Sequence, residues 1–255
     1  MRNVWTICRR ELYAYFVSPI AWVLLAIFSI LSGWFVWAES SYFVQNTMAS
    51  QMRGQPVPMS INEMIIAPIF GYIAVVGLML VPFISMRLFA EEKRQGTMEL
   101  LATSPVYDLE LVLGKWLAAV LMYGALLAVL ILDVSWLFIY GSPDWKPAVA
   151  GFIGLLLQGA GLLAFGALIS TLTKNQIVAG VTGFGLSLFL WILQWATSFG
   201  DSLTVRVASY ISTLSHMESF SRGVIDTKDL IYYLSMIFLG LFLTTRSLES
   251  IRWRA

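Results

Sequence analysis

Long apolar runs alternate with short polar segments along almost the whole chain. Each run approaches the roughly 20 residues that a helix needs to cross a hydrocarbon core about 30 Å thick. The pattern predicts an all-α membrane protein with six transmembrane helices in a single domain, residues 1–255. The predicted spans lie near residues 20–38, 65–89, 111–139, 148–172, 177–197 and 230–245. The segments between them, such as residues 39–64, are expected to be linkers, and Pro82 predicts a kink in the second span.

The first residues show a different pattern. Trp5, Cys8 and Leu12 recur at helical spacing, and polar side chains occupy the opposite face. Residues 3–17 are therefore predicted to form an amphipathic helix that lies in the membrane interface. Ser18-Pro19 ends this helix, because the residue before a proline disfavours helix and Pro19 suits the first turn of the next one.

Composition agrees with this pattern and narrows the function. The chain is 58% hydrophobic and 12% charged, whereas soluble domains carry about 25% charged residues. This low charged fraction means that much of the helix surface is expected to face lipid. The net charge of +1 gives no electrostatic field that would attract nucleic acid.

Eleven of the sixteen Lys and Arg residues lie on one side of the predicted spans. That side carries Arg2, Arg9, Arg10, Arg87, Lys93, Arg94, Lys115, Lys174, Arg246, Arg252 and Arg254, and the other carries Arg53, Lys146, Arg206, Arg222 and Lys228. The positive-inside rule therefore predicts that both termini are cytoplasmic.

The sequence lacks the residue patterns of catalysis. Gly114-Lys115 is followed by Trp116 and has no upstream glycine, so it is no P-loop. One histidine and one cysteine leave no His/Cys metal site and no nucleophile–base pair, because His216 lies on the far side of the spans from Cys8. We predict no catalytic residue and no metal site, and His216 is expected to be an interfacial polar residue.

Two of the polar residues inside predicted spans are candidates for a functional pathway. Asp133 is the only acid well within one, and Gln158 lies in the next. A polar group in lipid is either held by a structural hydrogen bond or lines a polar pathway, and both interpretations stay open for this pair.

The loop after the second span is the most informative segment. Charges of both signs are followed by Gly96-Thr97, which can start a helix, and Ser104-Pro105 stops it. We predict a short amphipathic helix that either rests on headgroups or docks into a soluble partner, and its mixed charge favours docking. The candidate partner-binding residues are Glu91, Glu92, Lys93, Arg94, Gly96, Thr97, Glu99, Leu101, Ser104 and Pro105.

This loop resembles the segment between the second and third spans of ABC-2 type permeases, in particular the gliding-motility type. The similar stretches run from Glu91 to Leu101 and from Ser104 to Val106, and two more, Arg10–Ala21 and Glu218–Asp226, fit the same family in register. The resemblance implies the permease subunit of an ABC transporter in a bacterial inner membrane.

The resemblance also implies partners and a division of labour. Two permease subunits, as a homodimer or with a paralogue, pair with two ABC ATPase subunits, which bind ATP and Mg. The helix after Gly96 is then a cytoplasmic coupling helix, and residues 198–229 supply short re-entrant or interfacial helices. No cofactor is expected in this chain itself.

Other functions remain open. The chain is also similar to the nitrous-oxide-reductase maturation permease, which implies force transmission to a periplasmic partner, such as a membrane protein with a periplasmic domain, without movement of a solute. The sequence disfavours a membrane enzyme, because no paired acid–base or nucleophile–base set converges on one side of the spans. It disfavours a plain scaffold, because a scaffold has no need for a mixed-charge helix. The sequence does not identify a substrate.

Overall fold

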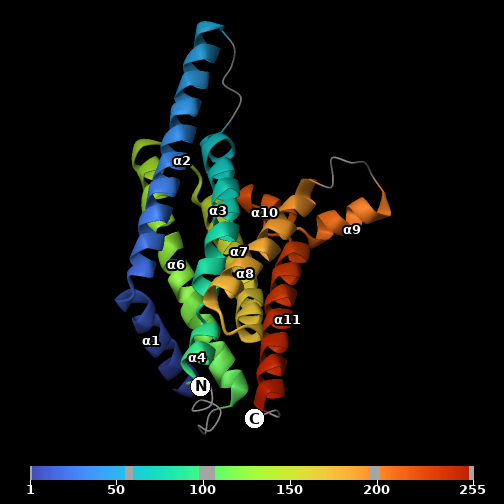
Figure 1. Cartoon of the computed structure of the whole chain (residues 1–255). Coiled ribbons are helices and arrows are strands. Elements are labelled where there is room, and N and C mark those ends of the chain that lie inside the picture. The colour runs from blue at the N-terminus through green and yellow to red at the C-terminus, as the bar shows by residue number, and fades with distance from the viewer. Residues whose placement is uncertain (1, 55–59, 98–106, 196–201, 253–255) are drawn as a thin grey trace.

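The computed structural model describes residues 2–54, 60–97, 107–195 and 202–252, and these residues contain helices and no strand (Figure 1). Six of their helical segments are long and apolar enough to cross a membrane, which confirms the predicted all-α architecture. The elements are α1 (Arg2–Val17), α2 (Pro19–Met52), η1 (Asn62–Ile66), α3 (Ala67–Ser85), α4 (Ala90–Gln95), α6 (Asp108–Tyr140), α7 (Trp145–Leu172), α8 (Gln176–Ile192), α9 (Leu203–Ile211), α10 (Thr213–Ser221) and α11 (Thr227–Arg252).

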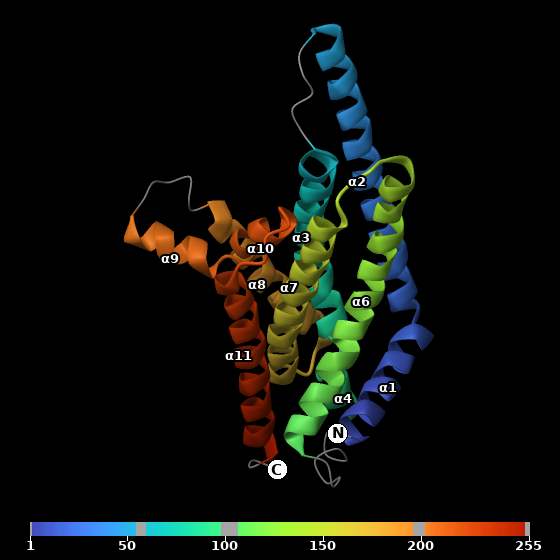
Figure 2. The ribbon, with the colours of Figure 1, turned by 180° about the vertical axis from the view of Figure 1, so that it is seen from behind.

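The two termini lie at the same end of the bundle, which we call the termini end; the opposite end is the far end (Figures 1 and 2). The long helices run alternately away from and toward the termini end, in the order α2, α3, α6, α7, α8 and α11. At the far end, α10 lies against the bundle and α9 extends sideways from it.

The break between α1 and α2 follows from two residues. Ser18 has an extended backbone and its hydroxyl accepts a hydrogen bond from the Ile20 N–H at 3.4 Å, as an N-cap does. Pro19 then begins α2, where its missing N–H costs nothing. The chain turns here, so α1 (residues predicted as 3–17) packs beside α6 instead of continuing the line of α2.

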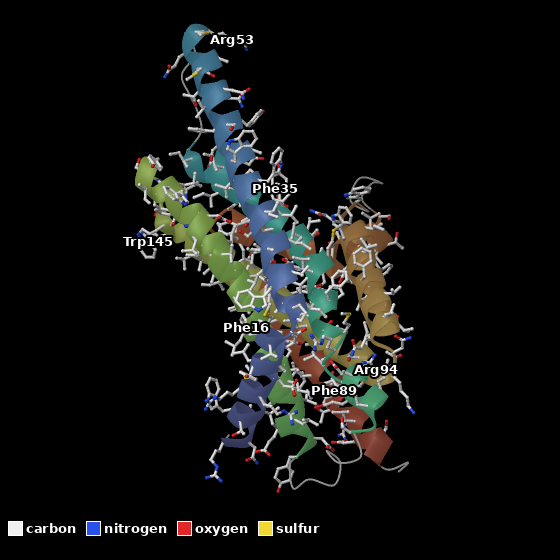
Figure 3. All side chains as sticks on the ribbon, turned by 60° about the vertical axis from the view of Figure 1, so that its left-hand side comes forward. Phe16, Phe35, Arg53, Phe89, Arg94 and Trp145 are labelled. Atoms are coloured by element: carbon white, nitrogen blue, oxygen red, sulfur yellow. The ribbon has the colours of Figure 1, made fainter. Side chains whose placement is uncertain are left out.

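The helix α2 is longer than the first predicted span. It continues from Glu39 to Met52, through residues predicted to be linker, and its 34 residues measure about 51 Å at 1.5 Å per residue. The segment Glu39–Met52 has no proline or glycine to stop the helix, which ends before Gly54 with its positive φ of 67°. This second half of α2 stands beyond the rest of the bundle at the far end, where Figure 3 labels Arg53.

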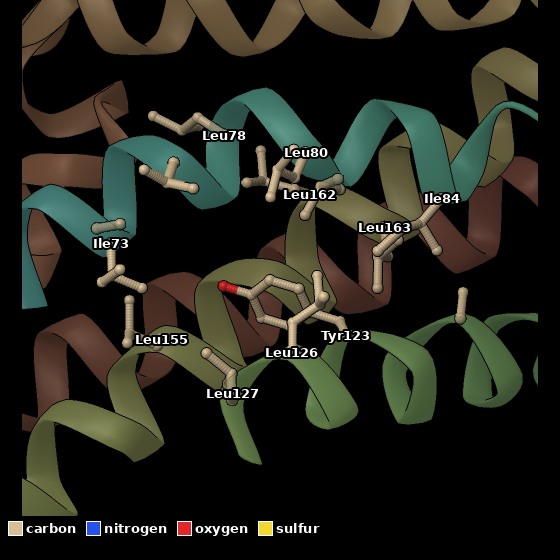
Figure 4. Close-up of a cluster of buried hydrophobic side chains, with 14 of the residues drawn as sticks. Ile73, Leu78, Leu80, Ile84, Tyr123, Leu126, Leu127, Leu155, Leu162 and Leu163 are labelled. Atoms are coloured by element: carbon tan, nitrogen blue, oxygen red, sulfur yellow. The ribbon is translucent and has the colours of Figure 1, made fainter. Parts of the chain in front are cut away.

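Glycines of α7 let large side chains approach its backbone at the centre of the bundle. A Cβ on Gly159 would lie 2.1 Å from the Tyr123 ring, and one on Gly151 would lie 2.4 Å from the Phe70 ring. Tyr123 thereby reaches between α3 and α7 among buried leucines such as Leu155 and Leu162 (Figure 4). Small residues permit this close packing where no hydrophobic force draws helices together.

The second predicted span is interrupted near its end. A short π-helix, η1, leads into α3, and α3 ends at Ser85, three residues after Pro82. The chain then turns through residues 86–89 before the short helix α4. This turn places the charged run that starts at Glu91 across the termini end.

Candidate functional site

A buried lysine organises the termini end. The Lys115 side chain of α6 is 2% exposed, and its Nζ lies 3.1 Å from Glu11 Oε1 of α1 and 2.9 Å from Glu92 Oε1 of α4. Its ammonium also lies 5.4 Å from the centre of the Phe89 ring, a cation–π distance. A lysine in an apolar helix needs such compensation, because an isolated buried charge is strongly unfavourable.

An arginine completes this arrangement from the exposed side. Arg10 Nη2 lies 2.7 Å from Glu11 Oε1 and 3.5 Å from Glu92 Oε1. Burial disfavours the charged form of Glu11, but the attraction of Lys115 and the hydrogen bond from Arg10 outweigh it and lower the pKa of Glu11. We call Arg10, Glu11, Glu92 and Lys115 the charge cluster; it joins α1, α4 and α6.

Direct backbone packing fixes α1 against α6 next to the charge cluster. A Cβ on Gly114 would lie 2.8 Å from Ile7 Cβ and 3.0 Å from the Val4 carbonyl oxygen, so only glycine fits there. The Asn3 amide also donates to Glu110 Oε2 at 3.0 Å. The two helices therefore have little freedom to move separately.

The turn before α4 is fastened to the end of α7. The Ser170 hydroxyl accepts hydrogen bonds from the Phe89 and Ala90 N–H groups, both at 3.0 Å, and donates to the Met86 carbonyl at 3.1 Å. Lys93 also donates to the Thr171 carbonyl. One buried hydroxyl thus satisfies two N–H groups at the start of a helix that lacks a side-chain cap of its own.

A second arginine ties the same turn to the junction of α1 and α2. Arg87 contacts Glu91 Oε2 at 3.2 Å and donates to the Ser18 hydroxyl at 2.8 Å. The Tyr15 hydroxyl donates to the Ile84 carbonyl at 2.8 Å. Residues 84–95 are therefore connected to the end of α1 and to Ser18 at the α1–α2 break.

The predicted partner-binding residues occupy different environments. The Glu92 side chain points into the charge cluster and Lys93 reaches back to α7, whereas Arg94 is exposed (Figure 3). Glu91 pairs with Arg87 and is 28% exposed. The charged run thus divides into residues that hold the turn and residues that face outward.

Gly96 ends the helix α4. It closes α4 with a φ of 72°, in the left-handed region, and the Thr97 N–H donates to the Glu92 carbonyl at 3.1 Å. The helix predicted to follow Gly96-Thr97, with Glu99, Leu101, Ser104 and Pro105, lies outside the described residues.

The two candidate pathway residues lie on different faces. Asp133 Oδ2 accepts a 2.5 Å hydrogen bond from the Ser32 hydroxyl of α2 and borders an open groove of about 420 Å³ between α2 and α6. Gln158 is buried and donates to the Ala74 carbonyl of α3 at 3.3 Å. Their hydrogen-bond partners sit on different helices, so the structure does not bring the two residues together.

The role of Lys115 was not predicted from the sequence, where Lys115 served only as one of the eleven positive charges that assign one side of the spans to the cytoplasm. A signal was present: a lysine near the start of a predicted apolar span requires an acid nearby. Two acids, Glu11 and Glu92, were available in the adjoining predicted interface segments. The pattern could not specify which of the acids on that side would pair with it.

Among the described residues, no group of three His, Cys, Asp or Glu side chains could hold a metal ion. In the charge cluster, two cations face two carboxylates, and Glu92 Oε2 is the oxygen that no donor reaches. The cluster connects three helices through opposite charges.

The sequence profile of a family described as "ABC-2 family transporter protein" matches residues 5–242. No curated protein matches the chain closely enough to count as a relative. The profile spans all six candidate membrane helices except the last residues of α11. The chain therefore belongs to the ABC-2 family of transporter proteins.

Proposed function

We propose that this permease subunit is driven by separate ABC ATPase subunits that dock at the termini end, which faces the bacterial cytoplasm. The observation that carries the proposal is the charge cluster, because it connects the loop-proximal helix α4 to α1 and α6 through buried ion pairs. The docking surface is then the outward side of residues 90–97 with the following segment, where the resemblance puts the coupling helix.

The mechanism follows from the cost of separating buried charges. Removing one partner from a buried ion pair costs about 3–5 kcal/mol, so displacement of α4 carries α1 and α6 with it. ATP and Mg, bound by two partner subunits, would bias the position of α4. The permease would work as a dimer with a second copy or a paralogue. Displacement of α1, α4 and α6 together would then change the packing between the spans of the two permease subunits.

A charge reversal with a matched control tests docking. Arg94→Glu changes an exposed residue at the termini end, and Arg222→Glu changes an exposed arginine at the far end. The full-length protein is purified from its native membrane, and the amount of bound ABC ATPase is measured for each variant. Because like charges across an interface cost several kcal/mol, we expect Arg94→Glu to reduce bound ATPase at least tenfold and Arg222→Glu to leave it unchanged. Equal retention by both variants would place docking elsewhere.

A second variant separates coupling from docking. Glu92→Gln with Lys115→Met removes both members of one ion pair, and Glu11 keeps its ion pair with Arg10. Neither substitution lies in residues 93–97, so the charge of that surface does not change. We expect the ATPase to bind as before but the dependence of ATP hydrolysis on the permease to be lost. Wild-type coupling in this double variant would show that the charge cluster does not transmit the motion.

One observation favours the alternative of force transmission without solute movement. The Glu39–Met52 half of α2 extends about 20 Å beyond the length needed to cross a bilayer, and it carries exposed apolar side chains, including Tyr42, Met48 and Met52. This half could contact a membrane protein with a periplasmic domain.

The alternative has its own test. In a force-transmitting complex, Tyr42→Ser with Met48→Ser should reduce the amount of periplasmic partner that co-purifies and leave ATP hydrolysis in vesicles unchanged. If the double variant instead lost transport of a solute into vesicles and still bound the partner, a solute exporter would be supported.

A further inference from the structure

The single histidine of the chain is buried at the far end, away from the charge cluster. The His216 side chain on α10 is 6% exposed. Its ring stacks on Tyr232 of α11 at 3.9 Å between centroids, and the Tyr210 ring of α9 meets it edge-on at 5.1 Å. Three elements thus enclose one imidazole.

Both ring nitrogens of His216 face oxygen atoms. Nδ1 lies 2.7 Å from Asp229 Oδ1, and Nε2 lies 2.9 Å from the Tyr210 carbonyl oxygen. A carbonyl oxygen can only accept, so this second contact requires a proton on Nε2. The first contact then requires another proton, either on Nδ1 or on the carboxyl group. The pair must hold one proton more than a neutral histidine beside a carboxylate.

The surroundings of Asp229 indicate where that proton resides. Asp229 is 1% exposed and lies in the first turn of α11, where the helix dipole favours a negative charge. Its Oδ2 has no hydrogen-bond partner among the described residues. A buried carboxylate of this kind needs a positive partner, and an imidazolium at 2.7 Å supplies it.

The nearest other charged groups have partners of their own. On α10, Arg222 pairs with Glu218 at 2.6 Å, and both are exposed. In the first turn of α11, Lys228 pairs with Asp226 at 3.1 Å and adds only a longer-range attraction to Asp229.

The elements packed on α10 add little: α3 and α8 contain no charged residue, and α7 contains only the exposed Lys146. The other titratable or charged groups on these elements are Tyr72 of α3, Arg206 and Tyr210 of α9, and Tyr232, Tyr233, Arg246, Glu249 and Arg252 of α11.

We propose that His216 and Asp229 form a buried proton-binding site, and that the bound proton fastens α9 to the bundle. No residue of α9 is buried. Its C-terminal end is held by the His216 contact to the Tyr210 carbonyl and by the Tyr232 hydroxyl, which donates to the Ile211 carbonyl at 2.6 Å. When the proton leaves for water, the pair becomes net negative, and the one proton that stays on the ring is held on Nδ1 beside the carboxylate. The Tyr210 carbonyl then loses its donor, and the Tyr232 hydroxyl remains as the contact that holds α9. This inference does not depend on the proposed ATPase partner.

Nitrogen NMR tests the proposal directly, because the full-length chain contains one histidine and its signals need no assignment. The protein is labelled with ¹⁵N-histidine and measured in lipid nanodiscs. An exposed imidazole is roughly nine-tenths neutral at about pH 7.5, whereas we expect both His216 nitrogens to carry protons there. A neutral ring with a bare Nε2 at that pH would overturn the proposal.

Two variants distinguish the proton site from ordinary packing. Asp229→Asn should make the ring neutral at about pH 7.5, whereas Tyr232→Phe removes a different hydrogen bond to α9 and should leave the ring doubly protonated. Amide exchange of Leu203–Ile211, corrected for the intrinsic pH dependence, should rise about tenfold between acidic and alkaline pH in the wild type, as expected for losing a charged donor. In Tyr232→Phe exchange should be faster at every pH with the same pH dependence. Unchanged ring protonation in Asp229→Asn, or exchange of α9 that does not respond to pH, would contradict the proposal.

Discussion

Both ends of the bundle bury charged groups to hold a peripheral helix, but they use different chemistry. At the termini end, Lys115 holds α1 and α4 through its ion pairs with Glu11 and Glu92. At the far end, α9 is held by the Tyr232 hydroxyl and by the His216 contact to the Tyr210 carbonyl, and the His216–Asp229 pair requires an added proton to make that second contact. The charge cluster is therefore suited to transmitting force between helices, whereas the His216–Asp229 pair is suited to responding to pH.

The largest effect is expected from removing the central cation. Lys115→Met leaves the half-buried Glu11 and Glu92 carboxylates with only the exposed Arg10 as a cationic partner, so it should lower the free energy of unfolding by up to about 3–5 kcal/mol. Thermal unfolding of the purified protein in one detergent measures this change.

The matched control for this prediction also removes both carboxylates that face Lys115. Glu11→Gln, Glu92→Gln and Lys115→Met together leave only Arg10, whose side chain is 57% exposed and is hydrated by solvent, and replacing a complete buried ion group is often close to neutral. The triple variant should therefore be more stable than Lys115→Met alone. A triple variant that is less stable would show that the cluster contributes net stability and not only connection.

A smaller loss is expected where the turn before α4 meets α7. Ser170→Ala leaves the buried Phe89 and Ala90 N–H groups without their acceptor, which should cost about 2–3 kcal/mol. Ser250→Ala, an exposed serine of α11, is the control and should change stability by less than about 0.5 kcal/mol. Equal effects of the two substitutions would mean that the Ser170 contacts do not hold α4.

The centre of the bundle connects the two ends, and its packing can be tested with two glycines. Gly159→Ala would place a Cβ 2.1 Å from the buried Tyr123 ring, and this overpacking should cost about 1–3 kcal/mol. Gly124→Ala meets nothing within 4 Å and should be neutral or slightly stabilising. The difference in thermal unfolding between the two variants measures how closely α6 and α7 pack.

The smallest effect is one of pH, and it has opposite signs at the two ends. The pKa of Glu11 is lowered in the folded protein, so its contribution to stability is present above the unfolded pKa of about 4.3 and is lost as the pH falls through the folded value. Burial raises the pKa of Glu92, which acts with the opposite sign on α4, so the prediction concerns α1, which carries Glu11. Amide exchange of α1 should therefore rise on acidification, whereas exchange of α9 should rise on alkalinisation. If both helices responded in the same direction, the comparison between the two ends would fail.

The sequence predicted the parts of the fold that depend on hydropathy and on local stop signals. Apolar length predicted the six spans, and Ser18-Pro19 predicted the break between α1 and α2 that the structure has. The extension of α2 to Met52 was not predicted, because Glu39–Met52 is too polar for a span and no tertiary contact can be seen in a sequence. Helix propensity alone was too weak a signal there.

The candidate site was less accessible from sequence for a related reason. Mixed charge between residues 91 and 94 predicted an outward, partner-binding surface, but Glu92 turns inward because Lys115 is buried beside it. His216 was expected at an interface, and it lies buried against Asp229. Pairing between charges far apart in the sequence is set by helix packing, which periodicity does not encode.

The central claim is that α1 and α4 move as one unit when the ATPase subunits bind ATP. Pulsed electron-spin measurements test it with Cys8 replaced by serine and with labels at two exposed positions, Tyr13 of α1 and Gln95 of α4. A second label pair joins Gln95 to the exposed Leu203 of α9 at the far end. We predict that ATP leaves the Tyr13–Gln95 distance unchanged and changes the Gln95–Leu203 distance. A change within the Tyr13–Gln95 pair would contradict the account, because the charge cluster would not be holding the two helices together.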